Sequence, residues 1–291
     1  MAGLHCPELS FTLCSSGLEV GPTAGCPLEA EVASPYLFAG DRRLAVDALK
    51  AVVELGDLPT ILVVSDRPSA SHSDELAAVY RAAGGNEVVL GSCLQTPQVL
   101  DRLRSLALDV AISVHFPELV REEALELPRR GWLNLHPAYL PFNRGWHTPS
   151  WPILEGTPAG VTVHRMVAEV DAGEILARRE VAVEPCDTAD QLYQRLLDAE
   201  LSLLLDVWST IRSPEPWPLT ANETAAGTVH RRRELFSDEV QRFDLDAPTT
   251  ARAVLDRLRA LTTDRWEEAA RFEVNGRTYR ARIDIRPDEV A

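Results

Sequence analysis

Hydrophobic positions follow two periods along the first two thirds of the chain. Short apolar runs of strand type alternate with stretches in which apolar residues recur every three or four positions, as on one face of a helix. The predicted strands are 36–39, Thr60–Ser65, Glu87–Leu90 and Val110–Val114, and the predicted helices are 44–55, Asp74–Ala83 and Pro97–Leu106. Alternating strands and helices predict the α/β class, with a Rossmann-like, mostly parallel sheet flanked by helices.

Three more strands and a long helix complete this region. The strands are Trp132–His136, Gly160–Met166 and Glu174–Val183. The sequence Thr188-Ala189-Asp190-Gln191 has the form of a capping box, and it predicts a helix from there to about Ile211.

The chain divides into three parts by composition. Residues 1–34 lack a sustained period and are interpreted as an N-terminal extension, although 10–14 could form a short strand. Residues 35–212 form the predicted catalytic domain. A proline-rich linker at Ser213–Pro218 opens a C-terminal subdomain, 213–291. This small α+β appendage contains a helix at 249–261 and a β-hairpin around Asn275-Gly276.

The composition is that of a soluble globular protein, with 45% hydrophobic and 25% charged residues among 291. The apolar runs are far shorter than a membrane span. A secretory signal would require basic residues near the N-terminus, but none precedes Arg42. We therefore expect a cytoplasmic protein without a membrane partner. The five cysteines are odd in number and form no CxxC pair, which argues against a disulfide framework or a zinc site.

The formal net charge of −15 argues against a nucleic-acid partner, which would need clustered cations to neutralise phosphates. The one conspicuous basic cluster is Arg231-Arg232-Arg233, with Glu234, Asp238 and Glu239 close behind it. It has two interpretations. The cluster is either a solvated turn neutralised by these acids or a clamp for a phosphorylated small ligand.

The candidate chemistry lies at the end of the strand 132–136. Side chains alternate along a strand, so Asn134 and His136 point to one face near its carboxyl end, where open α/β sheets bind ligands. Asp171 follows about 35 residues later. An amide, an imidazole and a carboxylate suit acyl transfer through an oxyanion, with the attacking group supplied by the substrate. Taken singly, each of the three is more often structural.

His115, His147 and His164 compete with His136 for that role. None of these histidines has the spacing of a known metal-ligand set, so we expect no metal site.

Several motifs resemble one family in the correct order. They are Asn134-Leu135-His136-Pro137, Leu140-Pro141, Arg144-Gly145, Gly160–His164 and Asp171–Ile175. Residues 36–185 are similar to the formyltransferase fold shared by glycinamide ribonucleotide transformylase, methionyl-tRNA formyltransferase and the sugar-nucleotide N-formyltransferases. The resemblance implies 10-formyltetrahydrofolate as formyl donor and a primary amine as acceptor.

The resemblance also implies roles for individual residues. Asn134 would donate to the oxyanion, His136 would polarise the formyl carbonyl and carry protons, and Asp171 would hold His136. The pterin would lie against the backbone of two segments. From these we expect Ser113, Val114, His115 and Phe116, and Ala168 and Val170, to bind the cofactor. For Val114 and Phe116, core packing is an equal alternative.

Two features limit the range of possible acceptors. The chain is acidic, and its C-terminal part looks too small to be the barrel of methionyl-tRNA formyltransferases. Residues 227–232 and 259–262 are more similar to the tails of sugar N-formyltransferases. We therefore expect a small-molecule amine, a nucleotide-linked amino sugar, as the partner, with a homodimer left open. Trp146 and Trp151 could stack on this acceptor or pack in the core. A methionyl-tRNA formyltransferase-like enzyme, a formyltetrahydrofolate hydrolase and a non-catalytic folate- or nucleotide-binding module are the alternatives.

Overall fold

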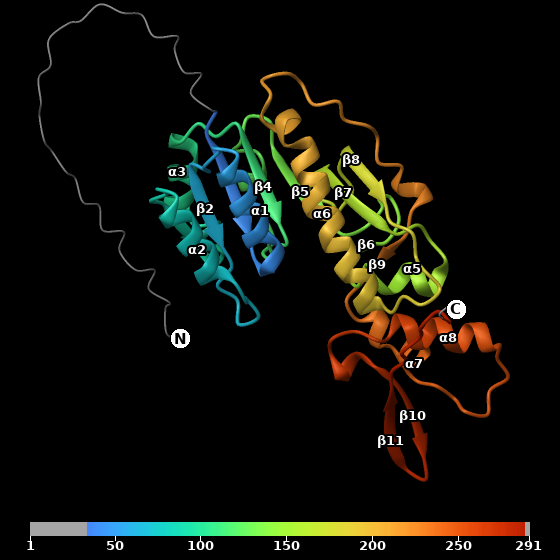
Figure 1. The fold of residues 1–291 in the computed structure, drawn as a ribbon. Helices are drawn as coiled ribbons and strands as arrows, with labels where there is room; N and C mark the ends of the chain where they lie inside the picture. The colour runs from blue at the N-terminus through green and yellow to red at the C-terminus, as the bar shows by residue number, and fades with distance from the viewer. Residues whose placement is uncertain (1–33, 289–291) are drawn as a thin grey trace, which may run out of the picture.

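A computed structural model describes residues 34–288 and contains a seven-stranded sheet in the order β3-β2-β1-β4-β5-β7-β8 (Figure 1). The first five strands are parallel, whereas β7 pairs antiparallel with β5 and with β8. The strands are β1 (Tyr36–Gly40), β2 (Ile61–Val64), β3 (Val88–Leu90), β4 (Val110–Val114), β5 (Trp132–His136), β7 (Gly160–Arg165) and β8 (Ile175–Glu180). The predicted α/β class with a mostly parallel sheet is confirmed.

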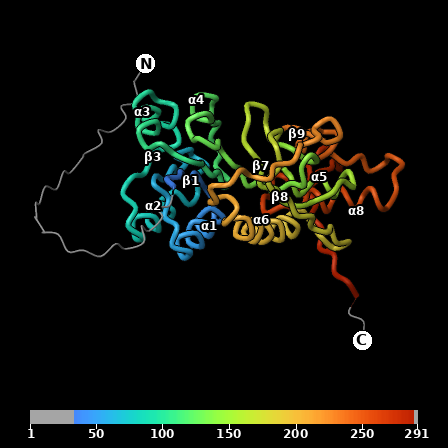
Figure 2. The backbone as a smooth tube through the Cα atoms, turned by 90° about the horizontal axis from the view of Figure 1, so that it is seen from above, coloured from blue at the N-terminus to red at the C-terminus, as the bar shows by residue number. Residues whose placement is uncertain are grey.

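Helices cover both faces of the sheet (Figure 2). One face packs on α1 (Arg42–Glu54), α2 (Ser73–Ala82) and α6 (Ala189–Arg212), and the other on α3 (Pro97–Ser105) and α4 (Glu122–Leu125). Along β1, Tyr36 and Phe38 enter the first core while Leu37 and Ala39 enter the second. A strand that is apolar on both sides is what two covered faces require.

The capping box at the start of α6 forms as the sequence predicts. The Thr188 hydroxyl accepts from the Gln191 backbone N–H at 3.3 Å, and the side-chain oxygen Oε1 of Gln191 accepts from the Thr188 backbone N–H at 2.9 Å. Two of the N–H groups that a helix start leaves unpaired are thereby satisfied. This fixes the start of the helix that lies along one face of the sheet.

The chain after α6 returns to the catalytic domain before it leaves again. Trp217 joins the main core, and Thr220 forms a bridge with Ile175 of β8. A short strand β9 (Val229–His230) then pairs in parallel with β6 (Arg144–Gly145). The segment just past residue 213 therefore packs on the catalytic part, and the domain boundary there stays a prediction.

The last part of the described chain is a small α+β unit that projects from the rest (Figure 1). Its antiparallel hairpin pairs β10 (Ala270–Val274) with β11 (Arg277–Ala281). Asn275 and Gly276 both have positive φ, 51° and 72°, as a two-residue hairpin turn requires. The other elements are α5 (Ser150–Glu155), α7 (Asp238–Gln241), α8 (Ala251–Ala260) and the 3₁₀ turns Gly91–Cys93, Thr224–Ala226, Glu234–Phe236 and Trp266–Glu268.

The strand expected at 10–14, the first three cysteines and nearly all of the predicted N-terminal extension lie outside the described residues. Within residues 34–288, no helix is both long and apolar enough to cross a membrane.

Replacing Thr188 by Ala should lower the free energy of unfolding by about 1 kcal/mol, because the start of α6 loses an N-cap hydroxyl. Chemical denaturation would measure the change. Thr249→Ala, at an exposed position just before α8, is the matched control and should change stability by less than about 0.5 kcal/mol. Equal effects of the two substitutions would contradict the importance of the cap.

Candidate active site

Strand β5 carries the two polar side chains that the alternation predicts on one face. Leu133 and Leu135 enter the core under α1 and α6, and Trp132 enters the opposite core. Asn134 and His136 therefore share the face of Trp132, and His136 is buried with 7% of its surface exposed.

Asp171 reaches this face from the turn between β7 and β8. Its Oδ2 lies 3.4 Å from Nε2 of His136 and its Oδ1 lies 3.5 Å from Nε2 of His164. The Gly145 backbone N–H donates to Oδ2 at 2.9 Å. The three residues predicted from the sequence are thus brought together, and a fourth side chain, His164, joins them.

The antiparallel pairing of β5 with β7 explains why His164 belongs to the cluster. His164 lies directly opposite Asn134 in the register, and side chains opposite each other in an antiparallel pair project to the same face. The Asn134 amide nitrogen lies 3.3 Å from Nε2 of His164. Sequence reasoning named His164 only as a competitor of His136, because alternation within one strand does not give the register with the next.

The hydrogen bonds of His164 define its protonation. Its Nδ1 lies 3.0 Å from the Arg165 carbonyl oxygen, which can only accept, so Nδ1 carries a proton. Burial lowers the pKa of His164 to about 4, although the Asp171 carboxylate opposes this shift. Nε2 of the neutral ring is then an acceptor, and it takes a hydrogen bond from the Asn134 amide. This orients Asn134 with its NH₂ group toward the cluster.

His136 differs from His164 in having an uncommitted ring nitrogen. Its Nε2 is buried, and within the described chain it has no hydrogen-bond partner of good geometry, although Asp171 lies within ion-pair distance. A buried polar atom without a partner requires an explanation, and a catalytic role is one of those known. The nitrogen is therefore placed to exchange a proton with a bound molecule or with Asp171.

The turn that carries Asp171 is held from several directions. Asp171 itself has a positive φ of 49°. Arg144 forms an ion pair with Glu169 at 2.9 Å, and the Asn222 amide donates to the carbonyl oxygens of Asp171 and Gly173. A Cβ on Gly173 would lie 1.9 Å from the Arg165 carbonyl oxygen, so only glycine fits there. These contacts fix the carboxylate against the two rings.

The residues predicted to bind the cofactor are distributed unevenly. Ser113 and Val114 lie inside β4 and are buried, whereas Phe116 packs partly on the core beneath α3 and α4. The second predicted segment is open, with Ala168 exposed and Val170 55% exposed. The role of these residues stays a prediction, which rests on their backbone groups.

The side chain of His115 is directed to the other face of the sheet. Its Nε2 lies 3.0 and 3.2 Å from the two carboxylate oxygens of Glu200, a fully buried residue of α6. His115 has φ of 51°, and this left-handed backbone breaks the alternation that would have placed it beside Ser113. A buried carboxylate needs such a partner, so the pair ties the loop after β4 to α6.

The two tryptophans near β6 have different environments. Trp151 is buried and stacks on His230 with ring centroids 3.8 Å apart, so it packs in the core. Trp146 is 50% exposed, with the Arg232 guanidinium 5.2 Å from its ring centre. No group of histidine, cysteine and acidic side chains among residues 34–288 could hold a metal ion.

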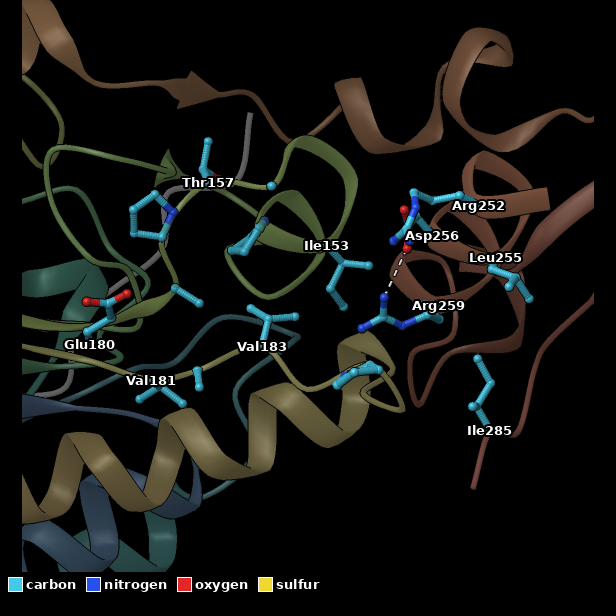
Figure 3. Close-up of a pocket in the computed structure, with 16 residues that line it drawn as sticks. Ile153, Thr157, Glu180, Val181, Val183, Arg252, Leu255, Asp256, Arg259 and Ile285 are labelled. Carbon is cyan, nitrogen blue, oxygen red and sulfur yellow. Dashed lines mark hydrogen bonds and ion pairs between the residues drawn. The ribbon is translucent and has the colours of Figure 1, made fainter. Parts of the chain in front are cut away.

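A hollow of about 740 Å³ lies between α5, β8 and α8 (Figure 3). Ile153, Val183 and Leu255 line it, together with Arg259, which forms an ion pair with Asp256 at 2.9 Å. Asn134, His136 and Asp171 do not line this hollow. Its volume alone therefore does not identify the site.

Comparisons with known proteins show the family of this chain. Residues 57–208 match the family described as formyl transferase, and residues 237–287 match an N-formyltransferase dimerization C-terminal domain. A dTDP-4-amino-4,6-dideoxyglucose formyltransferase of Mycobacterium tuberculosis is 30% identical over 241 residues, which cover 80% of this chain and 99% of that protein.

Solved structures share the fold. A 4-N formyltransferase from Francisella tularensis superposes with a TM-score of 0.70 at 19% identity, covering 87% of this chain and 98% of that one. An N-formyltransferase from Helicobacter canadensis, in complex with folinic acid and dTDP-3-aminofucose, gives a TM-score of 0.61 at 17% identity, covering 84% and 85% of the two chains.

His164 should make stability depend on pH. An unfolded imidazole takes up a proton near pH 6.5, whereas the buried ring stays neutral down to about pH 4, so acid favours the unfolded state between these values. We expect the free energy of unfolding to decrease as the pH is lowered through this window, by at most about 1.4 kcal/mol per pH unit from this group. Denaturation of wild type and His164→Gln at several pH values measures it. Identical slopes for the two proteins would refute the assignment.

Proposed function

Because this chain belongs to the formyl transferase family, we propose that it is an N-formyltransferase that moves a formyl group from 10-formyltetrahydrofolate to a nucleotide-linked amino sugar. The observation that carries the proposal is the convergence of Asn134, His136 and Asp171 at one buried face. The relatives support the substrates, since one is named for a dTDP-amino sugar and another was solved with a folate and a sugar nucleotide.

Asn134 acts as the oxyanion donor in this proposal. One N–H of its amide is directed to neutral His164, and the second is free to donate to the formyl oxygen as negative charge develops there. His164 is thus a positioning residue, which fixes the rotation of the amide. A donor held before the reaction stabilises the transition state without reorganising.

His136 and Asp171 handle the protons. When the acceptor amine attacks, a nitrogen–carbon bond forms and the amine must lose a proton. When the carbon–nitrogen bond to the folate breaks, the leaving nitrogen must gain one. The buried Nε2 of His136, 3.4 Å from the Asp171 carboxylate, suits both transfers because the carboxylate stabilises the imidazolium form.

We place the formyl donor at the sheet edge next to these residues. The backbone of 115–117 leaves β4 there, and the exposed segment 168–170 leads directly to Asp171. The His115–Glu200 pair would keep the first of these loops in place. We assign the pterin to the peptide groups of the two loops, because Ser113 and Val114 use their backbone within the sheet.

The alternatives predict different chemistry. A hydrolase would pass the formyl group to water and release formate without any amine. A methionyl-tRNA formyltransferase-like enzyme would need a basic face for the acidic tRNA, which a net charge of −15 disfavours. A binding module would need no amide, imidazole and carboxylate gathered around a buried reactive nitrogen. Transfer to a small amine is consistent with the acidic net charge and uses the amide, the imidazole and the carboxylate.

We propose a homodimer as the assembly, through the C-terminal region that matches the dimerization domain. The hairpin β10–β11 projects from the catalytic part, which leaves it accessible to a second copy (Figure 1). No nucleic acid is required, and a cytoplasmic location stays a prediction.

The wild-type protein should formylate an amino-sugar nucleotide when it is supplied with 10-formyltetrahydrofolate. Mass spectrometry of a panel of such amines would detect the product. His136→Ala should lower kcat by about 10²- to 10⁴-fold, because the proton carrier is lost while the folate loops remain. His72→Ala, at a ring that contacts Ser71 just before α2, is the matched control.

Binding of folinic acid by His136→Ala, measured by calorimetry, separates lost chemistry from lost folding. If no amine in the panel is formylated, or if His136→Ala turns over as fast as His72→Ala, the proposed function is wrong.

A further inference from the structure

Three consecutive guanidinium groups at Arg231–Arg233 are exposed and lack acidic partners. Among residues 34–288, no carboxylate lies within ion-pair distance of any of them. Of the three acids that follow in the sequence, Glu234 and Asp238 are engaged elsewhere, and Glu239 lies within ion-pair distance of none of the three arginines. Glu234 accepts from the Arg231 backbone N–H and lies 3.5 Å from His230, and Asp238 pairs with Arg271. The turn is therefore not neutralised locally, although the whole chain carries a net charge of −15.

This turn lies directly beside the candidate active site. β6 and β9 run parallel, so their carboxyl ends meet at the same edge, where Trp146 follows one strand and Arg231 the other. The Trp146 N–H donates to the His230 carbonyl oxygen at 3.1 Å. Gly145, one residue before Trp146, donates its N–H to Asp171. One residue step, about 3.8 Å, therefore separates the peptide that holds Asp171 from the base of the cationic turn.

Trp146 places one of the three guanidiniums. The Arg232 guanidinium lies over the indole at 5.2 Å from its centre, and Trp146 is itself fixed because its carbonyl oxygen accepts from the buried Trp151 at 2.9 Å. A cation stacked on an aromatic face loses less freedom when it binds an anion, and its five donors remain on the edge of the fork. Half of the Trp146 surface stays exposed.

We propose that Arg232, held on Trp146 and flanked by Arg231 and Arg233, binds the diphosphate of the nucleotide-linked acceptor. The inference rests on the proposed function and specifies which part of the acceptor this surface holds. With the diphosphate on Arg232, the attached sugar extends past Gly145 toward Asp171 and His136. Planar guanidinium forks match phosphate oxygens, and several of them at one place suit a group with two negative charges.

The cationic turn also explains how so acidic a protein binds an anionic substrate. The net charge repels a nucleoside diphosphate at long range, so a local field of the opposite sign is needed at the site. Three arginines are too few and too local for a nucleic-acid backbone, which requires a track of contacts. A single diphosphate is the ligand that their number fits.

The test compares Arg232→Gln with Arg232→Lys and with the control Arg81→Gln. Arg81 is an exposed arginine on α2, far from Arg232 in the sequence. Calorimetric titration of the full-length proteins with dTDP gives a Kd that does not depend on turnover. Steady-state rates with dTDP-4-amino-4,6-dideoxyglucose and 10-formyltetrahydrofolate give KM for each substrate. Thermal unfolding and folinic acid binding verify that each variant is folded.

We expect Arg232→Gln to raise the Kd for dTDP and the KM for the sugar nucleotide by about 10- to 100-fold, the effect of losing a charged hydrogen-bonding partner. The KM for the folate should stay within about twofold. Arg232→Lys should be intermediate because it keeps the charge but not the fork, and Arg81→Gln should match wild type.

A dTDP affinity of Arg232→Gln equal to that of Arg81→Gln would overturn the inference. Failure of the proposed function is distinguishable. In that case the wild type would formylate no amino-sugar nucleotide, and the dTDP titration would still report on Arg232.

Discussion

The arrangement depends on one fixed carboxylate. Asp171 lies between the rings of His136 and His164 and accepts a hydrogen bond from the Gly145 backbone N–H. Three strands contribute to these contacts of Asp171: β5 supplies His136, β7 supplies His164 and β6 supplies the Gly145 N–H group. A carboxylate with only 12% of its side chain exposed is costly without a hydrogen-bond donor, and the Gly145 N–H supplies one.

The two histidines near this carboxylate differ in their hydrogen bonds. Nδ1 of His164 donates to a backbone carbonyl oxygen, and burial keeps the ring neutral, so it can orient the Asn134 amide. His136 keeps an uncommitted Nε2. In the proposed function, His164 positions the amide and His136 transfers protons. In the proposed function, the cationic turn at Arg231–Arg233 extends the same site outward to the acceptor.

Much of the fold could be predicted from the sequence, since β4, β5 and the capping box of α6 lie where the residue pattern places them. The face shared by Asn134 and His136 also follows from alternation along one strand. The register of β5 with β7 does not, because it depends on tertiary packing, and His164 was therefore missed as a member of the site. The left-handed backbone of His115 could not be predicted for a similar reason, since nothing in the neighbouring sequence indicates that Glu200 pairs with His115.

The central claim is that the Asp171 carboxylate drives formyl transfer through His136, and a single-turnover measurement on Asp171→Asn tests it most directly. Asn keeps the size of the side chain and an oxygen that can accept from Gly145, but not the charge that stabilises the imidazolium. The account predicts that folinic acid and dTDP bind within a few-fold of wild type while the transfer rate falls by about 10²- to 10⁴-fold. A transfer rate near that of wild type, with both ligands bound, would contradict it.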